Sequence, residues 1–130
     1  MAHDSSVPKR VRFFTMGMGA AFLGLGVAKL LGLSPQFAFM EELGLPRALV
    51  PMIGAVELLI GMLCINRSTQ SYGALGVILL MGAAALSHVM SGSRLYMLFI
   101  NAYFLAAAVW VVRMERPRFL QVTHTSERHP

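Results

Sequence analysis

Four long apolar runs follow one another along the chain, separated by short polar segments. They cover residues 13–33, 48–65, 72–90 and 95–112, which gives them 21, 18, 19 and 18 residues. A helix needs about 20 apolar residues to cross roughly 30 Å of hydrocarbon, so each run is long enough to cross a bilayer once. The runs are continuously apolar rather than alternating, which excludes the strands of a β-barrel. The pattern therefore predicts an all-α polytopic membrane protein, a bundle of four transmembrane helices.

The segment between the first two runs carries its own helix signals. Ser34 and Pro35 are typical of a helix start, and Gly44 followed by Pro46 is typical of a stop. We therefore expect a short amphipathic helix over residues 35–43, with its glutamates facing water or headgroups and its apolar side facing lipid. Such a helix would lie in the membrane interface between the first and second spans.

The other connections are shorter. Residues 66–71 and 91–94 are polar and are predicted to form tight turns. Residues 1–118 are predicted to form one four-helix membrane domain, and residues 119–130 to form a polar tail without regular structure.

Composition and charge agree with a membrane protein and give it an orientation. The chain is 56% hydrophobic and 13% charged, outside the usual balance of a soluble globular domain. Four crossings would put eight of the eleven basic residues on one side of the membrane, which predicts that this side, with both termini, is cytoplasmic. These residues are Lys9, Arg10, Arg12, Arg67, Arg113, Arg116, Arg118 and Arg128, against Arg47 and Arg94 on the other side.

The same basic residues could also indicate a nucleic-acid-binding surface or a secretory signal peptide. Nucleic-acid binding would need a basic face interleaved with aromatic residues on a folded domain, and no stretch has that pattern. A secretory signal peptide shares the basic start, but its apolar part has about 7 to 15 residues before a small-residue cleavage site. The first run is longer than that, so we interpret it as a retained helix, with the lipid bilayer as the expected partner.

Residues with catalytic or metal-binding potential are scarce. Cys64 is the only cysteine, so an intramolecular disulfide or a CxxC redox pair is excluded. His3, His124 and His129 lie near the ends of the chain without metal-ligand spacing, and no phosphate-binding loop or nucleophile elbow is present. We predict no catalytic residue, no metal and no bound cofactor of the chain's own.

Four strongly polar residues interrupt the apolar runs, one in each: Lys29, Glu57, His88 and Asn101. From a rise of about 1.5 Å per residue, they lie roughly 6, 13, 3 and 9 Å from the outer ends of their helices, all in the outer half of the bilayer. A lone charge at mid-membrane costs about 2.5 to 3.5 kcal/mol on insertion scales, which favours an ion pair between Lys29 and Glu57. His88 and Asn101 could complete a hydrogen-bonded cluster.

Other interpretations of these residues stay open. Lys29 could extend to the outer headgroups, and His88 could be interfacial for the same reason. Glu57 lies too deep for that, so the alternative to an ion pair is a carboxyl that stays protonated because burial disfavours its charged form. A buried pair can serve packing specificity rather than chemistry, so the cluster alone does not predict a reaction.

Small residues predict how the helices meet. In the first run Gly24 belongs to a series of glycines and alanines at helical spacing, and in the second run Gly54 and Gly61 flank Glu57. Such surfaces let helix backbones approach closely in lipid. We interpret Gly24, Gly54 and Gly61 as helix-packing positions, with a homodimer through one such stripe as an alternative use.

Three segments together resemble the DoxX family of small four-helix membrane proteins. They are GVAKLLG at residues 26–32, FMEELGLP at residues 39–46 and IGAVELLIGMLC at residues 53–64. The resemblance covers nearly the whole chain and implies that Lys29 and Glu57 are the characteristic polar positions, with Gly54 and Gly61 as packing neighbours. The short second segment resembles the bacterial members, which favours a bacterial inner membrane, or the endoplasmic reticulum if the protein is eukaryotic.

The resemblance implies no single reaction, and three functions are compatible with the sequence. The first is a non-catalytic accessory or assembly subunit that binds another membrane protein or a second copy of itself. The second is the membrane subunit of a quinone-linked oxidoreductase, because some family members belong to a thiosulfate:quinone oxidoreductase. The third is a small proton-coupled transporter that uses Glu57, although a carboxylate paired with a lysine is a poor proton carrier.

Overall fold

The structure, a computed structural model, describes residues 8–92 and 95–125, with side chains up to residue 115. This part of the chain contains five helices and no strand, as the predicted all-α class requires. The helices are α1 (Lys9–Leu30), α2 (Gln36–Glu42), α3 (Leu49–Ile65), α4 (Gln70–Met90) and α5 (Leu95–Thr125).

Length and hydropathy identify the membrane segments among the described residues. Three are long and apolar enough to cross a bilayer, namely Lys9–Leu30, Gln70–Met90 and Leu95–Glu115, and the 17-residue helix α3 is a shorter apolar helix. The chain is therefore an integral membrane protein that crosses the bilayer more than once.

Two helix ends differ clearly from the prediction. Helix α1 begins at Lys9 rather than at residue 13, and α5 continues past residue 112 to Thr125, through much of the segment predicted to be an irregular tail. Hydropathy marks where the hydrocarbon ends, whereas a helix satisfies its own backbone hydrogen bonds and can continue into the polar region. Arg94 and Arg128, which contribute to the predicted charge bias, lie outside the described residues.

Glycines end α1 and α2 with the same local geometry. Gly32 and Gly44 have positive φ angles of 74° and 67°, which glycine adopts without steric cost. The following residue in each case donates its backbone N–H to a carbonyl five residues earlier, Leu33 to Ala28 and Leu45 to Met40, both at 2.9 Å. These bonds are those of a Schellman motif, so the chain turns sharply on both sides of α2.

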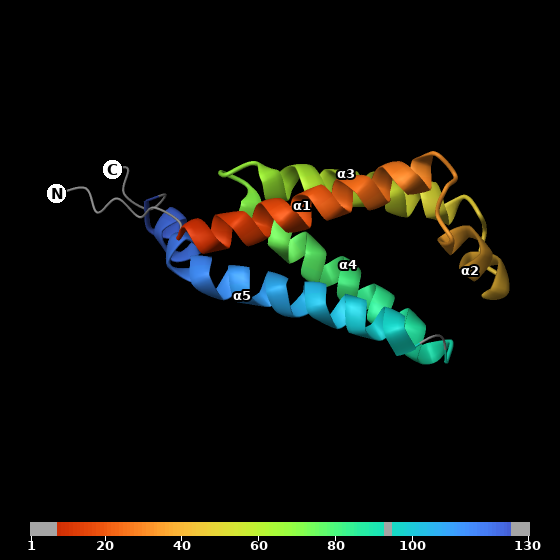
Figure 1. The fold of residues 1–130 in the computed structure, drawn as a ribbon. Coiled ribbons are helices and arrows are strands. Elements are labelled where there is room, and N and C mark those ends of the chain that lie inside the picture. The colour runs from red at the N-terminus through yellow and green to blue at the C-terminus, as the bar shows by residue number, and fades with distance from the viewer. Residues whose placement is uncertain (1–7, 93–94, 126–130) are drawn as a thin grey trace.

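The four long helices form two antiparallel pairs, α1 with α3 and α4 with α5 (Figure 1). The pairs lie together at the end where α1 begins, and they diverge toward α2 and the turn between α4 and α5 (Figure 1). We name the first the basic end, because Lys9, Arg10 and the Arg67 turn lie there, and the second the α2 end.

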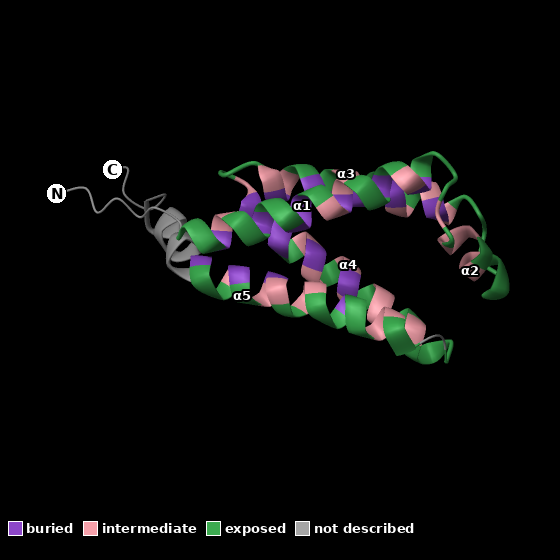
Figure 2. Ribbon diagram, viewed as in Figure 1, coloured by how far each residue is buried: buried purple, intermediate pink, exposed green. Residues whose placement is uncertain are grey.

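Helices α1 and α3 carry buried residues along their whole length, whereas those of α4 gather toward the basic end (Figure 2). The buried part of α4 extends from Gln70 to Met81, and no residue of α4 beyond Met81 is buried. Phe22 of α1 packs edge-on against Phe104 of α5 with ring centroids 5.7 Å apart. The core members are Val11, Met18, Phe22, Ile60, Cys64, Ala74, Val77, Met81, Ala108 and Val111. Many large apolar side chains outside this core are exposed, as expected for helices that face lipid.

Candidate functional site

The site is built on a close contact between α1 and α3 through two pairs of glycines. A β-carbon added to Gly19 would lie 2.9 Å from the carbonyl oxygen of Gly61, and one added to Gly61 would lie 2.9 Å from that of Gly19. Gly26 and Gly54 make the same reciprocal contact, at 2.6 and 2.9 Å, seven residues after Gly19 in α1 and seven residues before Gly61 in α3. Seven residues are two helical turns, so both contacts lie on one face of each helix and hold the antiparallel backbones together.

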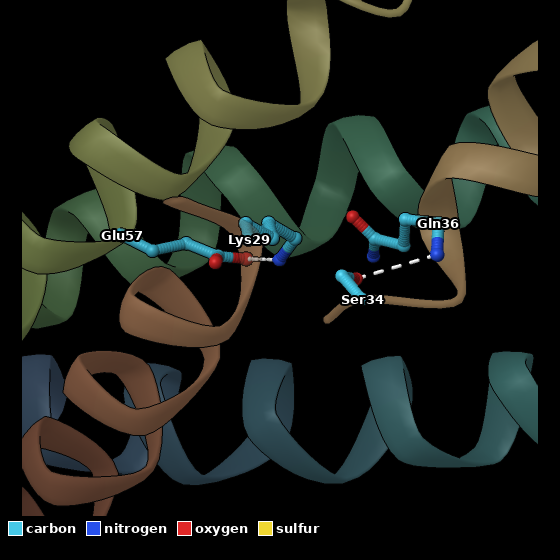
Figure 3. A network of polar contacts seen from close by, with 4 residues as sticks. All are labelled: Lys29, Ser34, Gln36 and Glu57. Carbon is cyan, nitrogen blue, oxygen red and sulfur yellow. Dashed lines mark hydrogen bonds and ion pairs between the residues drawn. The ribbon is translucent and has the colours of Figure 1, made fainter. Parts of the chain in front are cut away.

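This contact positions Lys29 beside Glu57. Lys29 follows Gly26 by one turn of α1, and Glu57 follows Gly54 by one turn of α3. Gly54 also makes room for the lysine, because an added β-carbon there would lie 2.8 Å from Cβ of Lys29. The lysine Nζ donates a hydrogen bond to Oε1 of Glu57, so the two form an ion pair between α1 and α3 (Figure 3).

The ion pair is almost completely enclosed by the protein. Lys29 is 2% exposed and Glu57 is 3% exposed. The second carboxylate oxygen of Glu57 is also buried and has no hydrogen-bond partner among the described residues. A buried charge is tolerated where an opposite charge neutralises it, so each residue stabilises the other inside the membrane region.

The other two predicted members of the polar cluster lie on α4 and α5. His88 contacts Phe39 of α2, with ring centroids 4.9 Å apart, and is half-buried near the α2 end. Asn101 is buried in α5, on the stripe that continues through Ala108 and Val111, and its amide Nδ2 has no partner among the described residues. The ion pair of Lys29 and Glu57 is therefore the observed part of the predicted cluster, and the inclusion of His88 and Asn101 stays a prediction.

Gly24 of α1, which was predicted to be a helix-packing position, does not have that role in the structure. Gly24 is exposed, and a β-carbon added there would meet nothing within 4 Å, so Gly24 does not pack against the protein's own helices. Gly19 and Gly26 take that role instead. The buried stripe of α1 passes through Met18, Gly19, Phe22, Gly26 and Lys29, and Gly24 lies outside it. The spacing of small residues predicts that they share one face of α1, but it does not tell whether that face points toward the other helices or toward lipid.

A second buried polar network, which the sequence pattern did not predict, lies at the basic end. The guanidinium of Arg12 donates hydrogen bonds to Oε1 of Gln70, at 3.1 Å, and to the backbone carbonyl of Ile65. Nε2 of Gln70 donates to Oε1 of Glu115. Gln70 is 1% exposed and Glu115 is 3% exposed. The network joins α1, α3, α4 and α5, and we name these side chains, Arg12, Gln70 and Glu115, the basic-end network.

These three residues lie in polar flanks of the apolar runs, where a polar residue is the ordinary expectation. One signal could have identified two of them. Gln70, Ala74 and Val77 continue the buried stripe of α4, and Glu115, Val111 and Ala108 continue that of α5. Extending both stripes beyond the apolar runs would have placed Gln70 and Glu115 in the core.

The fold and the enclosed ion pair define a small helical membrane protein with one charged pair between its first two long helices. A family model described as the DoxX-like family matches residues 13–111. The chain therefore belongs to the DoxX-like family, as the three sequence segments predicted. No curated protein and no solved structure matches the chain.

Proposed function

We propose that this DoxX-like protein is a non-catalytic accessory or assembly subunit of a membrane complex. The observation that carries the proposal is the enclosed Lys29–Glu57 pair. The two charges deepest in the apolar segments bind each other and are at most 3% exposed. A pair of this kind specifies how α1 and α3 pack, and it presents no charged group to a substrate.

The proposal includes a topology of four spans. Helix α3 packs along α1 through the glycine contacts described above. Because α1 is long enough to cross the membrane, α3 has the same inclination to the membrane as a spanning helix. Its 17 residues lie at the lower limit for crossing hydrocarbon. The basic end is then cytoplasmic, and α2 lies in the opposite interface. We place the protein in a bacterial inner membrane, with the endoplasmic reticulum as its eukaryotic equivalent.

One surface of α1 suits contact with a partner helix. Gly17, Ala20 and Gly24 are exposed, and β-carbons added to the two glycines would meet nothing within 4 Å. Small residues at this spacing let a second helix approach closely in lipid. We propose that this face, the small-residue face, binds another membrane protein or a second copy of the chain.

The first experiment tests whether the ion pair is required for assembly. Lys29→Met and Glu57→Gln are expressed in the native membrane, and the abundance of the protein and of the complex purified in mild detergent are measured. Both variants should lower abundance and complex yield, because each leaves one buried charge without its partner. Glu41→Gln is the matched control, because Glu41 pairs with Arg47 at 3.0 Å in an exposed position. Unchanged abundance and assembly in both variants would contradict the proposal.

The second experiment compares two glycines on one helix. Gly24→Leu should leave the fold intact and weaken association between differently tagged copies or with the partner, because its side chain would project from the small-residue face. Gly26→Leu should prevent folding, because a β-carbon there would already lie 2.6 Å from the carbonyl oxygen of Gly54. Normal association of Gly24→Leu would exclude the small-residue face as the binding surface.

The alternative functions place different demands on the structure. A quinone headgroup would have to bind away from Lys29 and Glu57, which bind each other, and His88 near α2 is then its best ligand. Proton-coupled transport would require Glu57 to separate from Lys29 and to exchange protons with water from an enclosed position. Uptake into proteoliposomes that depends on a pH gradient, and that is lost in Glu57→Gln, would favour transport over assembly.

A further inference from the structure

A cavity of about 280 Å³ lies between α2 and the ends of α4 and α5. Its walls come from three separate parts of the chain, which meet only at the α2 end. The lining residues are Pro35, Gln36, Ala38, Phe39, Glu42, His88, Tyr96 and Met97. We name it the α2 pocket, and it is separate from the Lys29–Glu57 pair, neither of which lines it.

The walls of the α2 pocket combine aromatic rings with one carboxylate. Phe39 lies over His88 with an angle of 31° between the rings, and Tyr96 adds a third ring. Glu42 is exposed and supplies the negative charge. No lysine or arginine is among the described residues that line the pocket, and the neighbouring Arg47 pairs with Glu41 instead. Aromatic faces beside a carboxylate favour a cationic ligand and disfavour an anionic one.

The surroundings of the pocket indicate that its ligand comes from the membrane. Leu33, Leu43 and Leu95, which belong to the segments that form the pocket, are exposed apolar residues. Tyr96 is at the first turn of a membrane helix, a position typical of aromatic side chains at the level of lipid headgroups. A ligand seated here would have its polar group in the pocket and its apolar part against these leucines.

We propose that the α2 pocket binds the amine end of a zwitterionic phospholipid, phosphatidylethanolamine or phosphatidylcholine. The ammonium group lies beside the carboxylate of Glu42 and against the rings of Phe39 and Tyr96. The side-chain amide of Gln36 donates a hydrogen bond to the lipid phosphate, and the acyl chains lie outside, on the exposed leucines. This site goes beyond the proposed assembly function and does not depend on it.

The test measures lipid binding to the purified full-length protein in detergent. Phosphatidylethanolamine, phosphatidylcholine and phosphatidylglycerol with identical acyl chains are titrated, and bound lipid is counted by native mass spectrometry. At least one of the two amine lipids should bind about fivefold to tenfold more tightly than phosphatidylglycerol, a ratio that a single cation–aromatic and carboxylate contact can supply. Equal or tighter binding of phosphatidylglycerol would overturn the proposal.

Two variants locate the binding within the pocket. Glu42→Gln should weaken binding of the preferred amine lipid by about threefold to tenfold, because the amide keeps the size of the side chain but loses its charge. Glu41→Gln is the matched control, since Glu41 is adjacent in sequence, carries the same charge and does not line the pocket. Phe39→Leu should also weaken binding, because the apolar volume is kept and the ring face is lost. Unchanged binding in Glu42→Gln and Phe39→Leu would overturn the site.

A quinone is the competing ligand for the same pocket, and the last experiment tests whether it displaces the lipid. A soluble short-chain quinone should not displace the bound amine lipid at concentrations that match the lipid. Displacement by the quinone, together with loss of quinone binding in a His88→Leu variant, would overturn the lipid assignment and favour the quinone-linked function instead. Failure of lipid binding with normal complex assembly would leave the assembly function standing.

Discussion

Gly54 and Lys29 lie in direct contact across the interface between α1 and α3. A β-carbon on Gly54 would lie 2.8 Å from Cβ of Lys29, a distance at which one of the two backbones would have to move. The missing side chain at Gly54 therefore allows the lysine stem to pass between the helices and to reach Glu57 one turn further along α3. The glycine contacts and the ion pair form one structural unit rather than two independent features.

This contact predicts a large difference between two conservative glycine substitutions. Gly54→Ala should lower the free energy of unfolding by about 1 to 3 kcal/mol, because the added methyl group overpacks the interface. Gly82→Ala in α4 should leave stability unchanged or raise it by about 0.5 to 1 kcal/mol, since its β-carbon would meet nothing within 4 Å. Thermal unfolding in detergent, followed by circular dichroism, measures both. Equal stability of the two variants would show that the close approach at Gly54 is absent.

A double-mutant cycle tests the energetic coupling of Lys29 and Glu57. Lys29→Met and Glu57→Gln should each lower the free energy of unfolding by about 3 to 5 kcal/mol, because the remaining buried charge has lost its partner. The double variant leaves no buried charge, so it should be more stable than at least one of the single variants. A double variant whose loss equals the sum of the two single losses would mean that the residues do not stabilise each other.

A buried polar residue can be predicted from the sequence when the residues around it are apolar. Lys29 and Glu57 stand out because each is a charge inside an apolar run, where burial has to be compensated. Gln70 and Glu115 lie just beyond their runs, where polar residues are ordinary, and only the three-dimensional packing shows that they are buried. Gly24 illustrates the opposite limit, because spacing identified a small-residue position but could not place it on the inner or the outer face of α1.

The basic-end network predicts unequal roles for two neighbouring arginines. Arg12→Gln should lower the free energy of unfolding by about 1 to 3 kcal/mol, because hydrogen bonds to Gln70 and to the carbonyl of Ile65 are lost. Arg10→Gln should change it by no more than about 0.5 kcal/mol, because Arg10 is exposed. Both variants remove one positive charge from the same end of the protein. Any effect of that charge on the orientation of the protein in the membrane is therefore the same in both variants and does not affect the comparison. Similar losses in both would indicate that the network does not stabilise the bundle.

The buried amide of Asn101 predicts a substitution that is neutral or stabilising. Its Nδ2 group has no hydrogen-bond partner among the described residues, so the folded protein keeps the cost of desolvating that group. Asn101→Leu replaces the amide with an apolar group of similar size and should leave the free energy of unfolding in detergent unchanged or raised. A loss above about 1 kcal/mol would show that the amide makes a stabilising contact in the protein.

Whether α3 crosses the membrane decides the side on which two turns lie. Cys64 is completely buried, so it should resist a water-soluble maleimide in intact membranes, and Cys64→Ala removes any residual reaction. In that background Ser68→Cys probes the turn after α3, and Ser91→Cys probes the turn after α4. Four spans place Ser68 on the cytoplasmic side and Ser91 on the outer side.

The two topologies give opposite labelling patterns, because each further crossing reverses the side of every later residue. With α3 as a span, a membrane-impermeant maleimide added from outside should label Ser91→Cys in intact cells, and should label Ser68→Cys only after permeabilisation. If α3 lay along the surface instead, Ser68→Cys would be labelled from outside and Ser91→Cys would be protected. A cysteine at residue 41, in place of Glu41 on α2, should be labelled from outside in either case, because it precedes α3, and it therefore controls for access of the reagent.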